Sequence, residues 1–333
     1  MVKKSKKKTF NYGTAILSAF EYLLKNYNEV FVIGQGLWSP WYVGNTMTDL
    51  EKKFGKNRVI DTPISESAVT GAAVGASLAG MKPIVVHPRM DFMLYAMDSI
   101  VNQAAKWSYM FGSQSHAGVT IRSIINRGGE QGAQHSQALH AWFAHVPGLR
   151  VVMPSTVTDA RDLLIASVLC KDPVMYIDDR WLYAQEDYLN PIVELDLKTQ
   201  KPKITLKGKD VTILASGHAS FLVRQAYKKL KTLDIKPEII DVRILNPLYI
   251  KDIIKSVKKT RKLVVVDPGW VSSGFSAELV AKVVENLDAQ CLSSPPLRIA
   301  LPDAPAPTAS ILEKKYYTSV DEIVKKIKIL VVK

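Results

Sequence analysis

Short apolar runs alternate with amphipathic segments along almost the whole chain, and this alternation restricts the possible folds most strongly. The apolar runs of strand length are residues 30–33, 83–86, 118–125, 149–153, 174–177, 211–214, 238–241, 263–266 and 298–300. The segments with helical spacing are residues 14–26, 66–79, 95–109, 157–169, 219–233, 248–258, 277–287 and 320–329. Strands and helices that alternate with short connections form mostly parallel sheets, covered by helices on both faces. We therefore expect an α/β protein.

A polar, proline-containing stretch divides this alternation into two halves. Residues 186–208 include Pro191 and Pro202 and have no sustained apolar period, so we interpret them as a linker. The chain has 333 residues, enough for two domains of roughly 100–200 residues each. The sequence therefore predicts two doubly wound domains, residues 11–185 and 209–333, preceded by a basic flexible tail at residues 1–10.

The chain is basic, with 44 Lys and Arg against 31 Asp and Glu and a formal net charge of +13. Such an excess can serve binding to nucleic acid or to an acidic partner. The basic residues are not interleaved with aromatic ones, as a nucleic-acid groove requires, so we do not expect nucleic-acid binding. No apolar run reaches the roughly 18 residues of a membrane span. Cys170 and Cys291 form no C-x-x-C pair, which favours a cytoplasmic protein with two buried thiols.

The segment Asp61-Thr-Pro-Ile-Ser-Glu66 is the sharpest local signal. Ser65 is expected to cap a helix that begins at Glu66. A purely structural explanation exists, because the helix dipole favours an acidic residue in the first turn. The functional hypothesis is that apolar and small neighbours such as Ile64 and Ala68 remove water from the carboxyl group. A desolvated carboxyl group is suited to general acid–base catalysis near neutral pH.

Three histidines follow the glycine-rich segment 126–133, namely His135, His140 and His145. Their spacing of five residues places them on different faces of a helix, so they do not form one metal site. His135 is nearest to the loop, where a strand-to-helix connection presents side chains at the carboxyl edge of a sheet. It can donate a proton or stabilise charge, or it can be a structural histidine. The sequence has no phosphate-loop or zinc-binding motif, and we expect no metal ligands in this chain.

Several ordered motifs resemble the β subunit of the E1 component of 2-oxo acid dehydrogenase complexes. They are residues 61–66, Gly71-x-Ala-x-Gly75, Ala96-x-Asp98-x-Ile-x-Asn102-x-Ala-Ala-Lys106, Ala133-Gln-His-Ser-Gln137, Asp241-Val-Arg243-x-Leu-Asn-Pro247 and Leu301-Pro-Asp303-Ala-Pro305. The similarity extends from about residue 11 to residue 329. It implies a pyrimidine-binding thiamine diphosphate domain followed by a transketolase-type C-terminal domain.

The resemblance also implies thiamine diphosphate as cofactor and assigns roles by position. Glu66 corresponds to the residue that hydrogen-bonds N1′ of the aminopyrimidine and favours the tautomer that deprotonates the thiazolium ring. His135 corresponds to the active-site histidine of the family. Phe92 corresponds to the aromatic residue that packs on the pyrimidine, and Ile64 lines the ring pocket.

The chain departs from the family pattern on the cofactor and substrate side. Gln35 stands where the family commonly has glutamate, and Tyr95 stands where pyruvate-type members commonly carry glutamine. We include both among the expected cofactor-binding residues. In addition, the run Val86-His-Pro-Arg-Met90 replaces the usual Glu-Phe-Met.

The family binds the diphosphate and Mg²⁺ with a Gly-Asp-Gly motif on the α subunit, and this chain has no Gly-Asp-Gly. The resemblance therefore implies an α-subunit partner, in an α2β2 heterotetramer, that holds Mg²⁺. The implied activity is decarboxylation of a 2-oxo acid with acyl transfer to a lipoyl-bearing E2. One alternative is a split, two-subunit transketolase-like or acyloin-forming enzyme outside these complexes, acting for example on a ketose. Another is a non-catalytic binding module that uses the basic tail.

Overall fold

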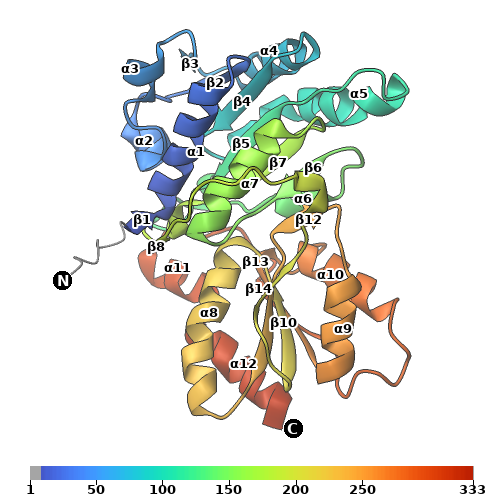
Figure 1. Cartoon of the computed structure of the whole chain (residues 1–333). Helices are drawn as coiled ribbons and strands as arrows, with labels where there is room; N and C mark the ends of the chain where they lie inside the picture. The colour runs from blue at the N-terminus through green and yellow to red at the C-terminus, as the bar shows by residue number, and fades with distance from the viewer. Residues whose placement is uncertain (1–8, 333) are drawn as a thin grey trace, which may run out of the picture. The chain divides into compact units, whose positions relative to one another are not determined.

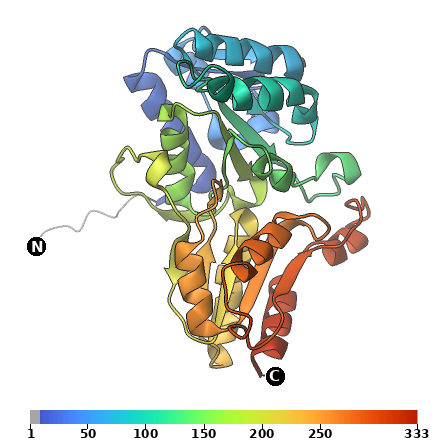
Figure 2. The same cartoon turned by 90° about the vertical axis from the view of Figure 1, so that its right-hand side faces the viewer.

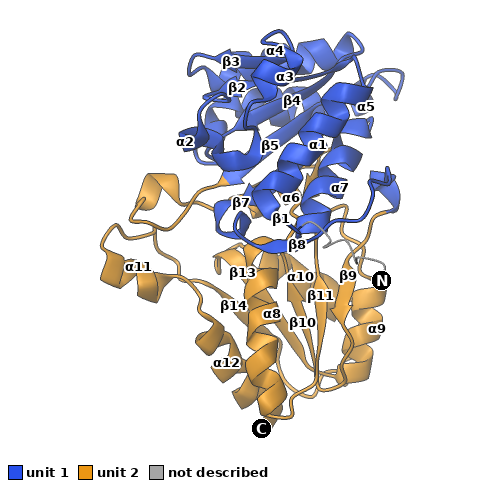
Figure 3. Ribbon diagram, turned by 60° about the vertical axis from the view of Figure 1, so that its left-hand side comes forward, with its two compact units in different colours: residues 1–124, 156–199 blue, residues 125–155, 200–333 orange. Residues whose placement is uncertain are grey.

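The computed structural model describes residues 9–332 and divides the chain into two compact units (Figure 3). Unit 1 comprises the chain up to residue 124 together with residues 156–199, and unit 2 comprises residues 125–155 and the chain from residue 200 onward. Residues 125–155 therefore belong to unit 2, although the predicted first domain includes them. The predicted domain boundaries themselves stay a prediction.

Unit 1 is an α/β unit whose strands lie between helices (Figure 1). The η elements are 3-10 turns, except for η3, which is a π-helix. In chain order the elements are β1 (Thr9–Asn11), α1 (Tyr12–Asn26), β2 (Val30–Gln35), α2 (Pro40–Val43), η1 (Gly44–Thr46), α3 (Leu50–Phe54), β3 (Val59–Thr62), α4 (Glu66–Leu78), β4 (Lys82–His87), η2 (Phe92–Ala96), η3 (Asp98–Ala104), α5 (Ala105–Met110), β5 (Thr120–Ile125), α7 (Val157–Leu169), β7 (Val174–Asp179), η5 (Arg180–Leu182), β8 (Glu186–Tyr188) and η6 (Leu197–Thr199).

The sheet of unit 1 has the strand order β7-β5-β4-β2-β3. β2 pairs in parallel with β3 and β4, and β4 pairs in parallel with β5. Helices α1 and α7 contact each other, and α4 contacts β4 and β2. Because the paired strands are parallel, the carboxyl ends of β2, β3 and β4 meet at one edge of the sheet. This edge carries the candidate site.

Unit 2 contains a second sheet with the order β14-β13-β10-β11-β9. All neighbours are parallel except β11 and β9, which are antiparallel. Its elements are η4 (Ala133–His135), α6 (His140–Ala144), β6 (Arg150–Val152), β9 (Lys203–Leu206), β10 (Val211–Ala215), α8 (Gly217–Thr232), β11 (Pro237–Asp241), β12 (Ile244–Asn246), α9 (Lys251–Thr260), β13 (Leu263–Trp270), α10 (Phe275–Val284), β14 (Leu297–Leu301), α11 (Ser310–Tyr316) and α12 (Val320–Val332). The short strands β6 and β12 pair antiparallel.

Helices cover both faces of this second sheet (Figures 1 and 2). Helices α8 and α12 lie together on one face, where Val223, Ala226 and Ile323 join one apolar core with the strands. Helices α9 and α10 contact the strands as well. Both units therefore confirm the α/β fold class expected from the sequence.

The polar stretch 186–208 is not a simple linker. β8 pairs antiparallel with β1, and β9 forms one edge of the unit 2 sheet. All three side chains of β8 are exposed, so this strand leaves no apolar signal in the sequence. The predicted basic tail also overlaps β1 at Thr9 and Phe10, whereas its residues 1–8 lie outside the described part of the chain.

Two smaller expectations can be compared with the structure. Cys170 is buried, but Cys291 is only half-buried, because it lies in the loop between α10 and β14 rather than in the core. Among residues 9–332, no helix combines the length and the apolar character that crossing a bilayer requires.

Candidate active site

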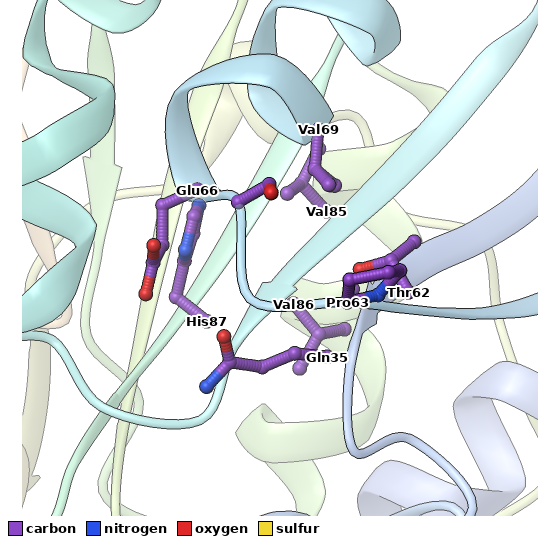
Figure 4. A pocket seen from close by; sticks show the side chains of 10 residues that line it. Gln35, Thr62, Pro63, Glu66, Val69, Val85, Val86 and His87 are labelled. Carbon is purple, nitrogen blue, oxygen red and sulfur yellow. The ribbon is translucent and has the colours of Figure 1, made fainter.

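A small pocket lies at the carboxyl edge of the unit 1 sheet (Figure 4). It is lined by Gly34, Gln35, Thr62, Pro63, Ser65, Glu66, Val69, Val85, Val86 and His87. These residues come from the ends of β2, β3 and β4 and from the start of α4. Its cavity volume is only about 10 Å³, because the hollow is shallow and open to solvent. Pockets that bury a drug-sized ligand measure roughly 300–1,000 Å³, so this pocket can hold only part of such a ligand.

Glu66 is half-buried and is the first residue of α4, as the sequence predicts. The expected cap is wrong in detail: Ser65 occupies the N-cap position, but its hydroxyl donates to the carbonyl of Ile64 at 2.7 Å and accepts no hydrogen bond from a helix amide. The predicted apolar cover is incomplete, because Ala68 is exposed and Ile64 is 69% exposed. Within this chain alone, one side of Glu66 is therefore left uncovered.

Two buried oxygens of the pocket have no hydrogen-bond partner among the described residues, Gln35 Oε1 and Thr62 Oγ1. An unsatisfied buried acceptor costs about 1–3 kcal/mol, so atoms of this kind point to a missing ligand. The turn that follows Gln35 is tied to β3, because Asp61 Oδ1 accepts from the Leu37 amide at 3.2 Å. Gly34 is required here, because a Cβ at this position would lie 2.4 Å from the carbonyl oxygen of Val86.

His87 is a pocket residue whose side chain the sequence analysis did not identify as functional. It ends β4 and is buried, and its Nε2 lies 3.2 Å from the hydroxyl of Thr70. In Figure 4 the imidazole of His87, the carboxylate of Glu66 and the amide of Gln35 occupy the same side of the pocket. Burial lowers the pKa of His87 to about 4, so the ring is neutral at physiological pH. A polar residue directly after the predicted strand 83–86 is the signal that could have identified it.

This burial predicts a pH-dependent stability. Above the ordinary histidine value of 6.5 both folded and unfolded chains carry neutral His87. As the pH falls from 6.5 toward 4, only the unfolded chain gains a proton there, so stability is lost in this window. The expected loss by pH 5 is about 2 kcal/mol. The free energy of unfolding, measured at pH 7 and pH 5, should fall less in His87→Gln than in the wild type. The exposed His145, changed to Gln, is the control, and an equal fall in both variants would contradict this account.

The structure separates the predicted cofactor residues into two groups. Glu66 and Gln35 line the pocket, whereas Ile64, Phe92 and Tyr95 do not line it. Phe92 begins η2, which packs against α4, and it is half-buried. Tyr95 is 75% exposed on the same turn. These three residues lie around α4 rather than in the pocket of the isolated chain.

His135 belongs to unit 2 and is half-buried at the end of η4. The loop that precedes it is tied to distant parts of the same unit. Arg127 Nη1 donates to the carbonyl of Pro268 at 2.8 Å, and both carboxylate oxygens of Glu313 accept from the amide of Glu130 at 3.2 Å. These bonds explain why residues 125–155 belong to unit 2, and they give the His135 loop a defined conformation.

A buried histidine–aspartate pair in unit 2 was also missed. His140 Nε2 lies 2.9 Å from Asp267 Oδ1, and Asp267 also accepts from the amides of Gly269 and Ser276. Burial alone would raise the pKa of Asp267, but His140 and these amides outweigh it and lower that pKa. The pair anchors α6 to β13 and to the start of α10. His140 therefore has a structural role in unit 2.

Two family descriptions match this chain. Residues 8–185 match "Transketolase, pyrimidine binding domain", and residues 200–323 match "Transketolase, C-terminal domain". A solved structure described as "Split gene transketolase, inactive beta4 tetramer" superposes with a TM-score of 0.78 and 18% identity. The superposition covers 97% of this chain and 98% of the chain of that structure. At this identity the likeness concerns the fold.

Curated relatives match over nearly the whole chain. The pyruvate dehydrogenase E1 component subunit beta of Rhizobium meliloti (strain 1021) is 35% identical over 96% of this chain and 69% of its own length. The mitochondrial subunit beta-1 of Arabidopsis thaliana is 37% identical over 93% of this chain and 86% of its own length. The acetoin:2,6-dichlorophenolindophenol oxidoreductase subunit beta of Bacillus subtilis (strain 168) is 31% identical over 95% of this chain and 96% of its own length.

Proposed function

Because the chain belongs to the family of the E1 component β subunits, built from a transketolase pyrimidine-binding domain and a transketolase C-terminal domain, we propose that it is the β subunit of a thiamine diphosphate-dependent 2-oxo acid dehydrogenase. It would act with an α subunit to decarboxylate a 2-oxo acid and to pass the acyl group to a lipoyl-bearing E2. The observation that carries this proposal is the position of Glu66, at the mouth of a pocket that contains unsatisfied buried oxygens.

The residues present fit the aminopyrimidine part of this cofactor. Gln35 Oε1 and Thr62 Oγ1 are acceptors without a partner in the described chain, and an amino-substituted ring offers the donors that they lack. When it is bound, the cofactor supplies the electron sink that lets a 2-oxo acid lose its carboxylate. The diphosphate and Mg²⁺ would be held by the partner chain, because the pocket is too small for the whole cofactor.

The residues of this chain would act through one carboxyl group and its surroundings. Glu66 would hold and exchange a proton at the ring nitrogen N1′, since it is the ionisable residue at the start of α4. Val69, Val85 and Val86 would exclude water from one face of the ring. The imidazole of His87, which burial keeps neutral, would add no positive charge beside Glu66. His135 would serve the substrate or the acyl transfer, as the family position implies.

A partner chain would complete the site from the exposed side of α4. The outward face of this helix carries only small residues, Ser67, Ala68, Ala72, Gly75 and Ala79. A Cβ at Gly75 would meet no described atom within 4 Å. Small residues allow another backbone to approach closely. Ile64 just before α4, and Tyr95 on η2, which packs against α4, add exposed apolar surface. We propose that the α subunit covers this surface in an α2β2 heterotetramer, which would also desolvate Glu66.

A second candidate function is supported by the acetoin oxidoreductase relative, whose match covers 95% of the present chain. In that case the chain is the β subunit of a split, acyloin-type enzyme outside the dehydrogenase complexes. The substitutions at Gln35 and at residues 86–90 lie beside the pocket and favour a donor that differs from pyruvate.

Both candidates can be tested with the same complex. The chain should be produced together with the α-like subunit of its own source, purified as a complex and assayed with thiamine diphosphate and Mg²⁺. A panel of 2-oxo acids with ferricyanide as acceptor tests the first function, and acetoin and ketose phosphates with dichlorophenolindophenol test the second. We expect turnover of a 2-oxo acid. Turnover restricted to acetoin or ketoses would replace the first proposal with the second, and a complex that binds no cofactor would refute both.

A further inference from the structure

Two arginines lie at the same edge of the unit 1 sheet as the pocket, and the family motifs account for neither. Arg89 follows the end of β4 by two residues, and Arg180 directly follows β7. In the strand order, β5 alone separates β4 from β7. Arg180 also binds the backbone carbonyls of Trp41 and Tyr42, which follow the end of β2. Both guanidinium groups therefore lie at the carboxyl edge of the sheet, where α/β units bind their ligands.

Neither arginine is neutralised by the described part of the chain. Arg180 Nη2 donates to the backbone carbonyls of Trp41 and Tyr42, and its Nε is buried without a partner. Arg89 Nη1 is also buried without a partner. Among residues 9–332, no carboxylate lies within ion-pair distance of either guanidinium. Burial, and then the nearby Arg180, lower the pKa of Arg89, while Asp91 partly opposes this effect. The two cations are therefore close enough to repel each other.

A structural arginine in the same sheet shows the contrast. Arg122 is fully buried in β5 and is bonded through each of its guanidinium nitrogens, to Asp178, Thr46 and Tyr183. Arg161 also has one buried nitrogen without a partner, Nη2, but its Nε is paired with Asp162, which balances its charge. Arg89 and Arg180 have buried N–H donors without an acceptor. This costs free energy, which hydrogen bonds to a bound anion would offset.

We propose that Arg89 and Arg180 form a binding site for the anionic group, carboxylate or phosphate, of the substrate. Guanidinium groups bind both anions through paired hydrogen bonds. The turn after β2 connects this site with the Glu66 pocket. Gly36 lies so close to Tyr42 that a Cβ on Gly36 would be 2.5 Å from Cγ of Tyr42. Arg180 in turn donates to the backbone carbonyl of Tyr42. Assignment of the anion to the substrate rests on the proposed function, whereas the anion site itself does not.

The first test is therefore independent of catalysis. The full chain without cofactor is titrated calorimetrically with inorganic phosphate and, separately, with glutarate. We expect saturable binding of at least one of them, weakened tenfold or more in Arg89→Gln and in Arg180→Gln. Arg89→Lys keeps the charge but loses the paired geometry, so its binding should be intermediate. Arg298→Gln removes the same charge from an exposed position in unit 2 and should leave the dissociation constant unchanged.

The second test uses the α–β complex and compares pyruvate with 2-oxoglutarate. Arg89→Gln should lower kcat/KM tenfold or more for both substrates if the pair binds the reacting 2-oxo carboxylate, or for 2-oxoglutarate alone if it binds a distal anion. The absence of saturable binding of both anions by the wild type, or unchanged binding in both Gln variants, would overturn the proposal. The proposal would also be overturned if a Gln variant bound phosphate normally but no longer assembled with the α subunit. If the titrations succeed while no 2-oxo acid is turned over, the proposed function fails and the anion site stands.

Discussion

Replacing Glu66 with glutamine is expected to lower turnover of the α–β complex by about 10²–10⁴-fold, the usual contribution of a general acid–base residue. Glutamine has nearly the same volume and can still form a hydrogen bond, but it cannot exchange a proton at neutral pH. The substitution lies at the first position of α4, where side chains face the pocket without supporting the core. The chain should therefore fold, bind its partner and retain most of its cofactor affinity.

The measurement is kcat of the purified complex, together with hydrogen–deuterium exchange at C2 of the bound cofactor. Both should fall in Glu66→Gln. Glu285→Gln, an exposed residue after α10, removes the same charge and should leave both rates unchanged. Normal turnover in Glu66→Gln would refute the acid–base role and restore the helix-dipole explanation for this residue.

Replacing Asp178 with alanine is expected to cost about 3–5 kcal/mol of stability, the usual effect of breaking a buried ion pair from one side. Asp178 and Arg122 are both fully buried, with Nε–Oδ1 and Nη2–Oδ2 distances of 3.1 and 2.8 Å. Burial by itself would lower the pKa of Arg122, but Asp178 and Tyr183 hold it above its ordinary value. The guanidinium therefore stays charged, and without Asp178 it remains in the core without a counter-ion.

Denaturant unfolding followed by circular dichroism should show this loss. An exposed ion pair, Lys52 with Asp49, provides the control: Lys52→Ala should cost only about 0–1 kcal/mol. The double variant Arg122→Met with Asp178→Leu should be more stable than Asp178→Ala, because it removes both buried charges. Equal midpoints for Asp178→Ala and the wild type would show that solvent reaches this pair.

The sequence predicted those elements whose buried residues form an apolar run or recur with a helical period. The buried strands β2, β4 and β7 and the helices α4 and α7 begin within a residue of their predicted positions. β3 was missed, because its four residues are mostly half-buried and include Asp61 and Thr62, so it forms no apolar run. β8 was missed for the same reason, and α2 was missed because a helix of four residues is too short to show a helical period.

The candidate site was only partly accessible from the sequence. Glu66 was found through a local motif and Gln35 through its position in the family pattern, and both line the pocket. Their catalytic and cofactor-binding roles, and the role of His135, stay predictions. Thr62 and His87 were missed, because nothing in their immediate sequence says that a hydroxyl and an imidazole enter the same pocket.

The order of polar and apolar residues by itself determined the α/β class, the two-part organisation and the helix start at Glu66, since these depend on contacts between near neighbours in the chain. The tertiary structure alone decided which strand ends meet. It places Gln35, Thr62 and His87 around Glu66, brings Arg89 and Arg180 to one edge, and ties residues 125–155 to the second unit. Strand order and long-range hydrogen bonds depend on how whole elements pack, and no local window of sequence records that packing.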